Sequence, residues 1–247
     1  MTELVHLDVA EGVATITLDS EHNRNALSRQ LVTELAAHLE TAESDADAKV
    51  IVLRSAHRVF CSGADLSEAA EGSMQQGAAA LIDLQRRLAT SAKPVVVVLA
   101  GPVRAGGLGL VGAADIVLAS RSVTFALTEV RLALAPAVIS LSLLPRLAPR
   151  AASDLFLTGR KFDAVEAAEI GLVSRVVEDG ELEAGLQAVL ADLAQGYPQG
   201  FRETKALLNH DLVERIDHLG DQVAEQSARL FGSDEAREAM LAFLSKR

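Results

Sequence analysis

The first part of the chain alternates between apolar and polar residues, as half-buried β-strands do. Two such runs, residues 4–9 and 13–18, are separated by a Glu-Gly pair and predict an N-terminal β-hairpin. The apolar positions that follow are spaced for a helix instead. Ser28 can serve as the N-cap of a helix that extends to about residue 43. One face of this helix would carry Leu31, Leu35 and Leu39.

Three short apolar runs further along the chain predict buried strands. Residues 50–53 and 115–119 are mostly aliphatic, and residues 95–99 are an unbroken run of valine and leucine, typical of a strand covered on both faces. Helical spacing is clearest at residues 78–89 and again from about residue 141 onward. We therefore predict an α/β fold in which strands come early and helices come late.

No segment rich in proline, glycine or serine divides the chain. We expect one α/β core domain of residues 1–189, followed by a C-terminal helical region of residues 190–247. The length of 247 residues and the hydrophobic content of 49% are sufficient for a large core. Neither a signal sequence nor an uncharged apolar run of about 18 residues is visible, which predicts a cytoplasmic protein without a membrane span.

Charge and composition exclude several classes of function. A net charge of −11 argues against nucleic acid and against anionic membrane surfaces as partners, because both require basic surfaces. Aromatic residues make up only 3% of the chain, so stacking on bases or sugars is not expected. The single cysteine, Cys61, excludes an internal disulfide. The six histidines lack metal-ligand spacing, so no metal is predicted.

A glycine-rich segment follows the all-aliphatic strand. Gly107, Gly109 and Gly112, with Glu129 further on, fit the spacing of a dinucleotide-binding fingerprint. That fingerprint requires a tight turn from strand to helix. Six residues lie between Ala100, where the strand would end, and Gly107, and the following helix would be too short for the usual crossover. We therefore disfavour a nucleotide-binding fold.

The same glycines suit a different use. A helix that begins near Gly106 presents backbone N–H groups that lack intrahelical acceptors, and its dipole favours negative charge. Residues 61–65 form a second loop that also follows a strand and precedes a helical stretch. One N–H group from each loop can together stabilise the oxyanion of a thioester enolate.

Five segments resemble, in order, the characteristic blocks of the crotonase (enoyl-CoA hydratase/isomerase) superfamily. They cover residues 23–28, 59–66, 93–116, 125–136 and 157–173. The Gly-Leu-Gly-Leu and Glu-Val-Arg sequences within them are most similar to a branch that includes methylglutaconyl-CoA hydratases. Each block alone is a weak signal, but their order over most of the chain makes chance agreement improbable.

This resemblance implies a crotonase fold, in which repeated ββα units form two roughly perpendicular sheets and C-terminal helices help to close the site. It implies an acyl-CoA thioester as the substrate and a homotrimer or hexamer as the assembly. It implies no separate cofactor, because coenzyme A is part of the substrate.

The resemblance also implies roles for individual residues. The backbone N–H groups of Ala64 and Gly106 would form the oxyanion hole, and Glu129 would be the catalytic acid/base. Gly109 stands where the family's hydratases generally have a second glutamate, so the two-carboxylate mechanism cannot operate in its usual form. The residues expected to bind the substrate are Arg24, Ala26, Gly63, Asp65, Leu66, Arg104, Gly107, Gly109 and Lys205.

We expect an enoyl-CoA hydratase that uses Glu129 as its single acid/base. Two alternatives stay open: double-bond isomerisation of a 3-enoyl-CoA, which needs only one carboxylate, and non-catalytic binding of acyl-CoA. Arg104 would pair with a carboxylate on the acyl chain, or else with Glu129 or a surface acid. We interpret Cys61 as a packing residue, Asp115 as a structural carboxylate and His22 as a surface histidine.

Overall fold

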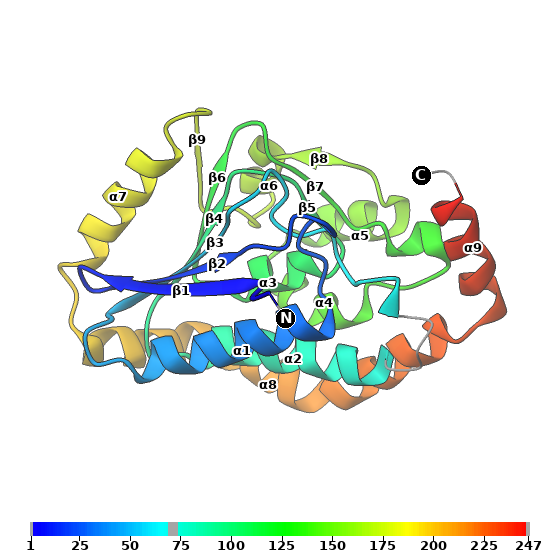
Figure 1. Cartoon of the computed structure of the whole chain (residues 1–247), viewed down its shortest axis with the longest axis horizontal. Coiled ribbons are helices and arrows are strands. Elements are labelled where there is room, and N and C mark those ends of the chain that lie inside the picture. Colours follow the sequence, from blue (N-terminus) through cyan, green and yellow to red (C-terminus); the bar gives the residue numbers. More distant parts are fainter. Residues whose placement is uncertain (1, 69–73, 246–247) are drawn as a thin grey trace.

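The structure, a computed structural model that describes residues 2–68 and 74–245, contains two β-sheets packed among helices (Figure 1). The strands are β1 (Val5–Ala10), β2 (Val13–Leu18), β3 (Val50–Ser55), β4 (Val95–Leu99), β5 (Val103–Arg104), β6 (Ile116–Ser120), β7 (Thr124–Ala126), β8 (Phe162–Asp163) and β9 (Arg175–Val177). The helices are α1 (Arg29–Ser44), α2 (Met74–Thr90), α3 (Gly107–Ala113), the 3₁₀ helix η2 (Glu129–Leu132), α4 (Ala137–Leu143), α5 (Pro149–Thr158), α6 (Ala164–Glu169), α7 (Leu182–Leu193), α8 (Pro198–Phe231) and α9 (Asp234–Leu244). The predicted α/β class with a helical C-terminal region is confirmed.

The larger sheet has six strands in the order β1-β2-β3-β4-β6-β9, and the smaller sheet has the order β5-β7-β8. Strands β1 and β2 form the predicted antiparallel hairpin, with Val5 opposite Leu18. The remaining pairs of the larger sheet are parallel. Helix α1 begins as predicted, since the Ser28 side chain accepts a hydrogen bond from Leu31 N.

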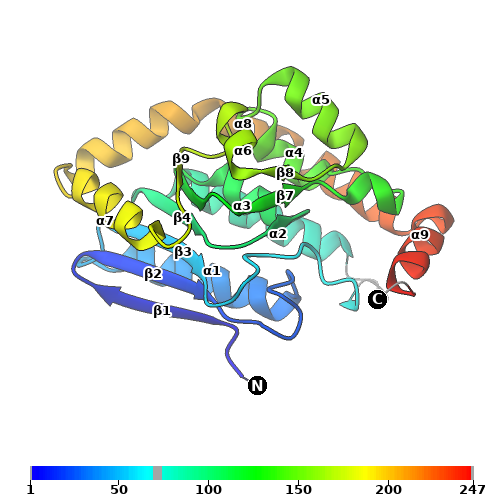
Figure 2. The same cartoon turned by 90° about the horizontal axis from the view of Figure 1, so that it is seen from above.

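Both faces of the larger sheet are covered, which explains the unbroken aliphatic run of β4. Val95, Val97 and Leu99 belong to the main core, to which α1, α2 and α3 contribute. Val96 and Val98 point the other way and pack with residues of α7, because side chains alternate along a strand. Figure 1 shows α1, α2 and α8 running side by side along the sheet, and Figure 2 shows α7 beside β9.

The C-terminal helices pack against elements from earlier in the chain. Helix α8 packs against α2 and α4, and α9 packs against η2. The expected division at residues 189 and 190 falls inside α7, and the separation into two regions there stays a prediction. Among the described residues, no helix combines the length and apolar content that crossing a bilayer requires.

The topology brings three loops to one edge of the larger sheet. Because β2, β3 and β4 are parallel, the segments that follow them lie at the same edge. Two of these loops approach each other closely: a Cβ atom on Gly101 would lie 1.8 Å from Arg58 O, so only glycine fits. Phe60 N donates to Pro102 O at 3.1 Å across the same contact.

Candidate active site

The loops after β3 and β4 are joined where the sequence predicted an oxyanion hole. Cys61 and Val103 form a parallel bridge, and Arg104 N donates to Cys61 O at 2.9 Å. Gly63 has a φ of 97°, and a Cβ atom there would lie 2.8 Å from Ala105 Cβ. Ala105 itself has a left-handed φ of 46°, which is costly for a residue with a side chain and is typical of functional loops.

The backbone N–H groups of Ala64 and Gly106 lie at one cavity. Leu27 pairs with Ala64 by donating from its own N–H to Gly63 O at 2.8 Å, which leaves the Ala64 N–H outside that pairing. Neither the Ala64 nor the Gly106 N–H donates to an acceptor within the described residues. A Cβ atom on Gly106 would lie 3.8 Å from Ala64 N, so glycine keeps the space between the two donors open.

The cavity has a volume of about 600 Å³, within the range of small-molecule sites. Its walls come from the loops after β2, β3 and β5, from α1 and α2, from η2 and α4, and from α8 and α9. Apolar side chains of the interior wall include Leu81, Leu132, Leu134, Val138, Ile139 and Phe231. The interior is therefore suited to an apolar group.

Glu129 lines this cavity from the first position of η2. Helices α5 and α9 pack against η2, and Leu134 N donates to Glu129 O at 3.0 Å. The Glu129 Oε2 atom is buried and has no hydrogen-bond partner within the described residues. Burial raises the pKa of Glu129 to about 7. A carboxyl group with a pKa near neutrality is suited to accept and then return a proton.

Gly109 does not line the cavity, because α2 and α4 close the space beside it. A Cβ atom on Gly109 would lie 2.9 Å from Ile139 Cγ2 and 3.2 Å from Gln85 Cδ. Gln85 is fully buried, and its Oε1 accepts a hydrogen bond from Ser142 Oγ at 2.6 Å. The place of the family's second glutamate is thus already filled.

Basic side chains stand at the exposed opening of the cavity. His22, Arg24 and Arg29 all line it and are all exposed. In the described part of the chain neither arginine forms an ion pair, so both guanidinium groups can bind an anion. Asp65 and Glu68 line the same cavity, so the opening offers basic groups to a polyanionic ligand without being uniformly positive.

The other residues predicted at the substrate site divide into two groups. Ala26, Asp65 and Leu66 line the cavity with Arg24, and their role in binding substrate stays a prediction. Gly63 and Gly107 do not line the cavity. A Cβ atom on Gly107 would lie 2.7 Å from Cys61 Cβ, so this glycine allows α3 to approach the loop.

Arg104 and Lys205 are placed elsewhere, which corrects two expectations. The Arg104 guanidinium donates to Val103 O and to Thr124 Oγ1, and within the described residues it pairs with no carboxylate, Glu129 included. Lys205 is only 5% exposed, and its Nζ lies 2.7 Å from Asp115 Oδ2. It also donates to two backbone oxygens, so its ammonium group is not available to a phosphate.

The expectations for Cys61 and Asp115 agree with the structure. Cys61 is buried, and burial raises the pKa of its thiol to about 12, which suits packing and not nucleophilic catalysis. Asp115 is a structural carboxylate that accepts from Val95 N and pairs with Lys205. Within residues 2–68 and 74–245, no group of three or more histidine, cysteine or acidic side chains is arranged to hold a metal.

Comparisons with known proteins agree with this geometry. An enoyl-CoA hydratase structure from Mycobacterium avium is 46% identical, with a TM-score of 0.92 over 100% of this chain and 98% of that one. The 1,2-epoxyphenylacetyl-CoA isomerase of Escherichia coli is 31% identical over 257 residues, covering 100% of this chain and 97% of that protein. The model of the Enoyl-CoA hydratase/isomerase family matches residues 8–247. The chain belongs to the enoyl-CoA hydratase/isomerase family.

Membership of the enoyl-CoA hydratase/isomerase family confirms the predicted superfamily and identifies the chain as an enzyme of this family. A further structure, an enoyl-CoA hydratase from Bacillus halodurans, is 25% identical with a TM-score of 0.90 over 97% of this chain and 99% of that one. The narrower resemblance to methylglutaconyl-CoA hydratases stays a prediction.

Three residues at or beside this enoyl-CoA hydratase/isomerase site were not assigned roles from the sequence. Arg29 directly follows the Ser28 cap, and Asn25 lies inside the first family block. Gln85 is a polar residue on the apolar face of α2, one turn from Leu81. For Gln85 the sequence did carry a signal, a polar residue on an otherwise apolar helix face, because a buried polar group must find hydrogen-bond partners.

Proposed function

We propose that the chain is an enoyl-CoA hydratase-like enzyme that adds water to a 2-enoyl-CoA thioester, or removes it in reverse, with Glu129 as the single acid/base. The observation that carries this proposal is the shared cavity. It holds the N–H groups of Ala64 and Gly106, which have no acceptor within the described residues, and the Glu129 carboxylate, whose Oε2 is buried and whose pKa burial raises to about 7. The names of the related proteins support the same activity.

The first part of the mechanism is polarisation of the thioester. The carbonyl oxygen accepts hydrogen bonds from Ala64 N–H and Gly106 N–H, which draws electron density away from Cβ. The negative charge that develops on this oxygen is stabilised in a cavity with apolar walls. One such donor contributes roughly 2.7–4 kcal/mol to the transition state.

The second part is proton transfer through Glu129. In its ionised form the carboxylate accepts a proton from water as the oxygen of that water bonds to Cβ. The electron pair of the double bond moves toward the thioester oxygen. The protonated carboxyl then returns the proton to Cα, so one group serves both steps. No second carboxylate is required, which fits the filled space beside Gly109. No cofactor takes part.

The lining of the cavity indicates an apolar acyl group. Arg24 and Arg29, at the opening, would bind the phosphates of coenzyme A. The described ionisable lining residues are His22, Arg24, Arg29, Asp65, Glu68 and Glu129, and of these only Glu129 belongs to the η2 side of the cavity. A second carboxylate on the acyl chain would meet Glu129 and no cation, because Arg104 bonds to Thr124. We therefore favour a monocarboxylic acyl chain over a methylglutaconyl-type substrate.

Isomerisation of a 3-enoyl-CoA is the second candidate, and the filled space beside Gly109 favours it as well. A single carboxylate can move one proton between Cα and Cγ. The experiment that separates the candidates follows absorbance of the conjugated enoyl thioester. Loss of absorbance with crotonyl-CoA supports hydration, and a gain with a 3-enoyl-CoA supports isomerisation. Binding of either thioester without turnover would contradict both and indicate a non-catalytic acyl-CoA-binding protein.

We also propose that the chain assembles as a homotrimer or hexamer. Large apolar side chains are exposed on α5 and α8, where Leu157 is 75% and Leu207 is 81% exposed. Light scattering of the eluting protein measures the assembly, and a monomeric mass would contradict this proposal. A cytoplasmic location stays a prediction.

A further inference from the structure

One buried polar residue beside the site, Asn25, has no role in the mechanism above. It lies between Arg24 and Ala26, is 0% exposed, and does not line the cavity. Its Oδ1 accepts a hydrogen bond from Ser20 N at 2.7 Å. Its Nδ2 lies 2.8 Å from Ser55 Oγ and within 3.1 Å of two backbone oxygens. A fully bonded polar group at such a position usually fixes the segments that it joins.

The two segments joined by Asn25 are the two halves of the site. Ser20 N belongs to the loop that carries Arg24. The two backbone oxygens are those of Val59 and Phe60, which lead directly into the loop that carries Ala64. Asn25 therefore connects the phosphate-binding side of the cavity to one donor of the oxyanion hole.

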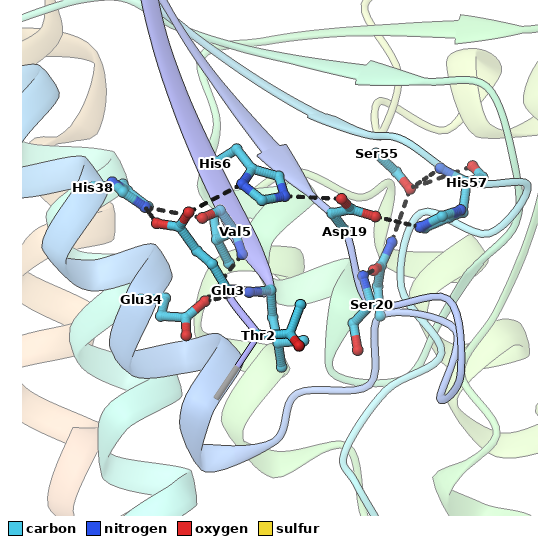
Figure 3. A network of polar contacts seen from close by, with 12 residues as sticks. Thr2, Glu3, Val5, His6, Asp19, Ser20, Glu34, His38, Ser55 and His57 are labelled. Atoms are coloured by element: carbon cyan, nitrogen blue, oxygen red, sulfur yellow. Dashed lines mark hydrogen bonds and ion pairs between the residues drawn. The ribbon is translucent and has the colours of Figure 1, made fainter.

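Neighbouring contacts continue this connection. Ser62 Oγ donates to Asn23 O at 3.0 Å, further along the same pair of loops. On the other side, Ser55 Oγ accepts from His57 N, and His57 Nε2 lies 2.6 Å from Asp19 Oδ1 (Figure 3). Figure 3 also shows Ser20 beside Asp19. Asn25 is the buried centre of this arrangement.

The chemistry of the position suits asparagine in particular. Asn25 has a left-handed φ of 53°, which asparagine adopts more readily than most residues. The site requires one acceptor, facing Ser20 N, and one donor group, facing three oxygens. Aspartate would turn a carboxylate oxygen toward two carbonyl groups, and glycine would supply no group at all.

We propose that Asn25 is a positioning residue that holds the Ala64 N–H at the thioester oxygen while the Arg24 loop holds the coenzyme A end. This inference rests on the proposed function only in that Ala64 N–H binds a thioester oxygen. Coenzyme A that binds at Arg24 thereby aligns the reacting carbonyl with the Ala64 N–H. Binding energy from a remote part of the substrate is used in this way in catalysis.

The test compares Asn25→Gly and Asn25→Asp with the unchanged protein. Glycine retains the left-handed backbone without the amide, and aspartate retains the shape without the donor. Both variants should lose kcat by up to about 10²-fold, because a displacement of roughly 1 Å has that effect, while KM changes much less. A conjugated aryl-enoyl-CoA provides a second readout. Its absorbance moves to longer wavelength when the carbonyl is polarised, and this shift should shrink in both variants.

A matched control is Asn209→Ala. Asn209 is 2% exposed and also makes three hydrogen bonds, to Ala89 O, Asp115 and Arg146, but it lies on α8 and does not line the cavity. Its loss should lower the melting temperature without changing kcat or the absorbance shift. Ser55→Ala is a milder variant that removes one partner of Asn25, and it should reduce the shift in part.

Retention of kcat and of the shift in folded Asn25 variants, or equal loss in Asn209→Ala, would overturn the proposal. If the Asn25 variants do not fold, an unchanged shift in Ser55→Ala would overturn it. Failure of the proposed function is distinguishable, because it would show as absence of turnover in the unchanged protein. The absorbance shift needs only binding, so it decides the role of Asn25 in that case too.

Discussion

The close packing beside Gly109 allows a prediction of how a side chain added there would change the free energy of unfolding. In an open helix, alanine is more stable than glycine by roughly 0.8–1.0 kcal/mol. At position 109 the added Cβ would lie 2.9 Å from Ile139 Cγ2 and 3.2 Å from Gln85 Cδ, and both neighbours are buried. Overpacking of a tight core typically destabilises by about 1–3 kcal/mol. We therefore expect Gly109→Ala to be destabilised by up to about 2 kcal/mol, although helix propensity alone would favour alanine.

Two further variants control this experiment. Gly200 lies in α8 with no atom within 4 Å of an added Cβ, so Gly200→Ala should be neutral or more stable by up to about 1 kcal/mol. Ile139→Ala removes the crowding methyl group. In urea unfolding, Gly109→Ala should cost less in the Ile139→Ala background than in the original chain. Additive effects of the two changes, or a stabilised Gly109→Ala, would refute the argument that this space is filled.

Three more predictions concern buried groups. Burial raises the pKa of Glu129 from 4.5 to about 7, so the stability that its protonated form contributes is present below pH 4.5 and is lost as the pH rises through 7. The free energy of unfolding of Glu129→Gln should therefore exceed that of the original chain by up to about 3 kcal/mol near pH 8 and by little near pH 4. Equal differences at both pH values would contradict this. Lys205→Met leaves the Asp115 carboxylate unpaired and should destabilise by about 3–5 kcal/mol, with an unchanged KM for the thioester; a raised KM would restore a substrate-binding role. Cys61 should resist a thiol reagent at pH 8 until the protein unfolds, and rapid native labelling would disprove its burial.

The sequence was sufficient for elements whose environment is repetitive. The aliphatic run of β4 predicted a strand with two covered faces, and the Ser28 cap predicted the start of α1. The closeness of the two loops that carry Ala64 and Gly106 was also predictable, because each follows a parallel strand and the strands share one edge. In these cases the local sequence pattern and the sheet topology predict the same position for each element.

Positions that depend on distant segments were not predictable in the same way. Lys205 was expected to bind the substrate, but α8 packs along α2 and buries the ammonium group with Asp115, 90 residues earlier in the chain. The sequence showed that Gly109 lacks a carboxylate, but not that Gln85 and Ile139 occupy the space. Arg104 bonds to Thr124 because β5 pairs with β7, two short strands with little periodicity.

The central claim is that Glu129 alone carries the proton in the catalytic step. The most direct test is the turnover of crotonyl-CoA by the original chain and by Glu129→Gln, which retains the shape and removes the base. General acid–base catalysis contributes roughly 10²–10⁴-fold, so we expect a loss of that size. In the original chain, kcat/KM should rise with pH through about 7, as Glu129 ionises. Turnover by Glu129→Gln within about tenfold of the original would contradict the account.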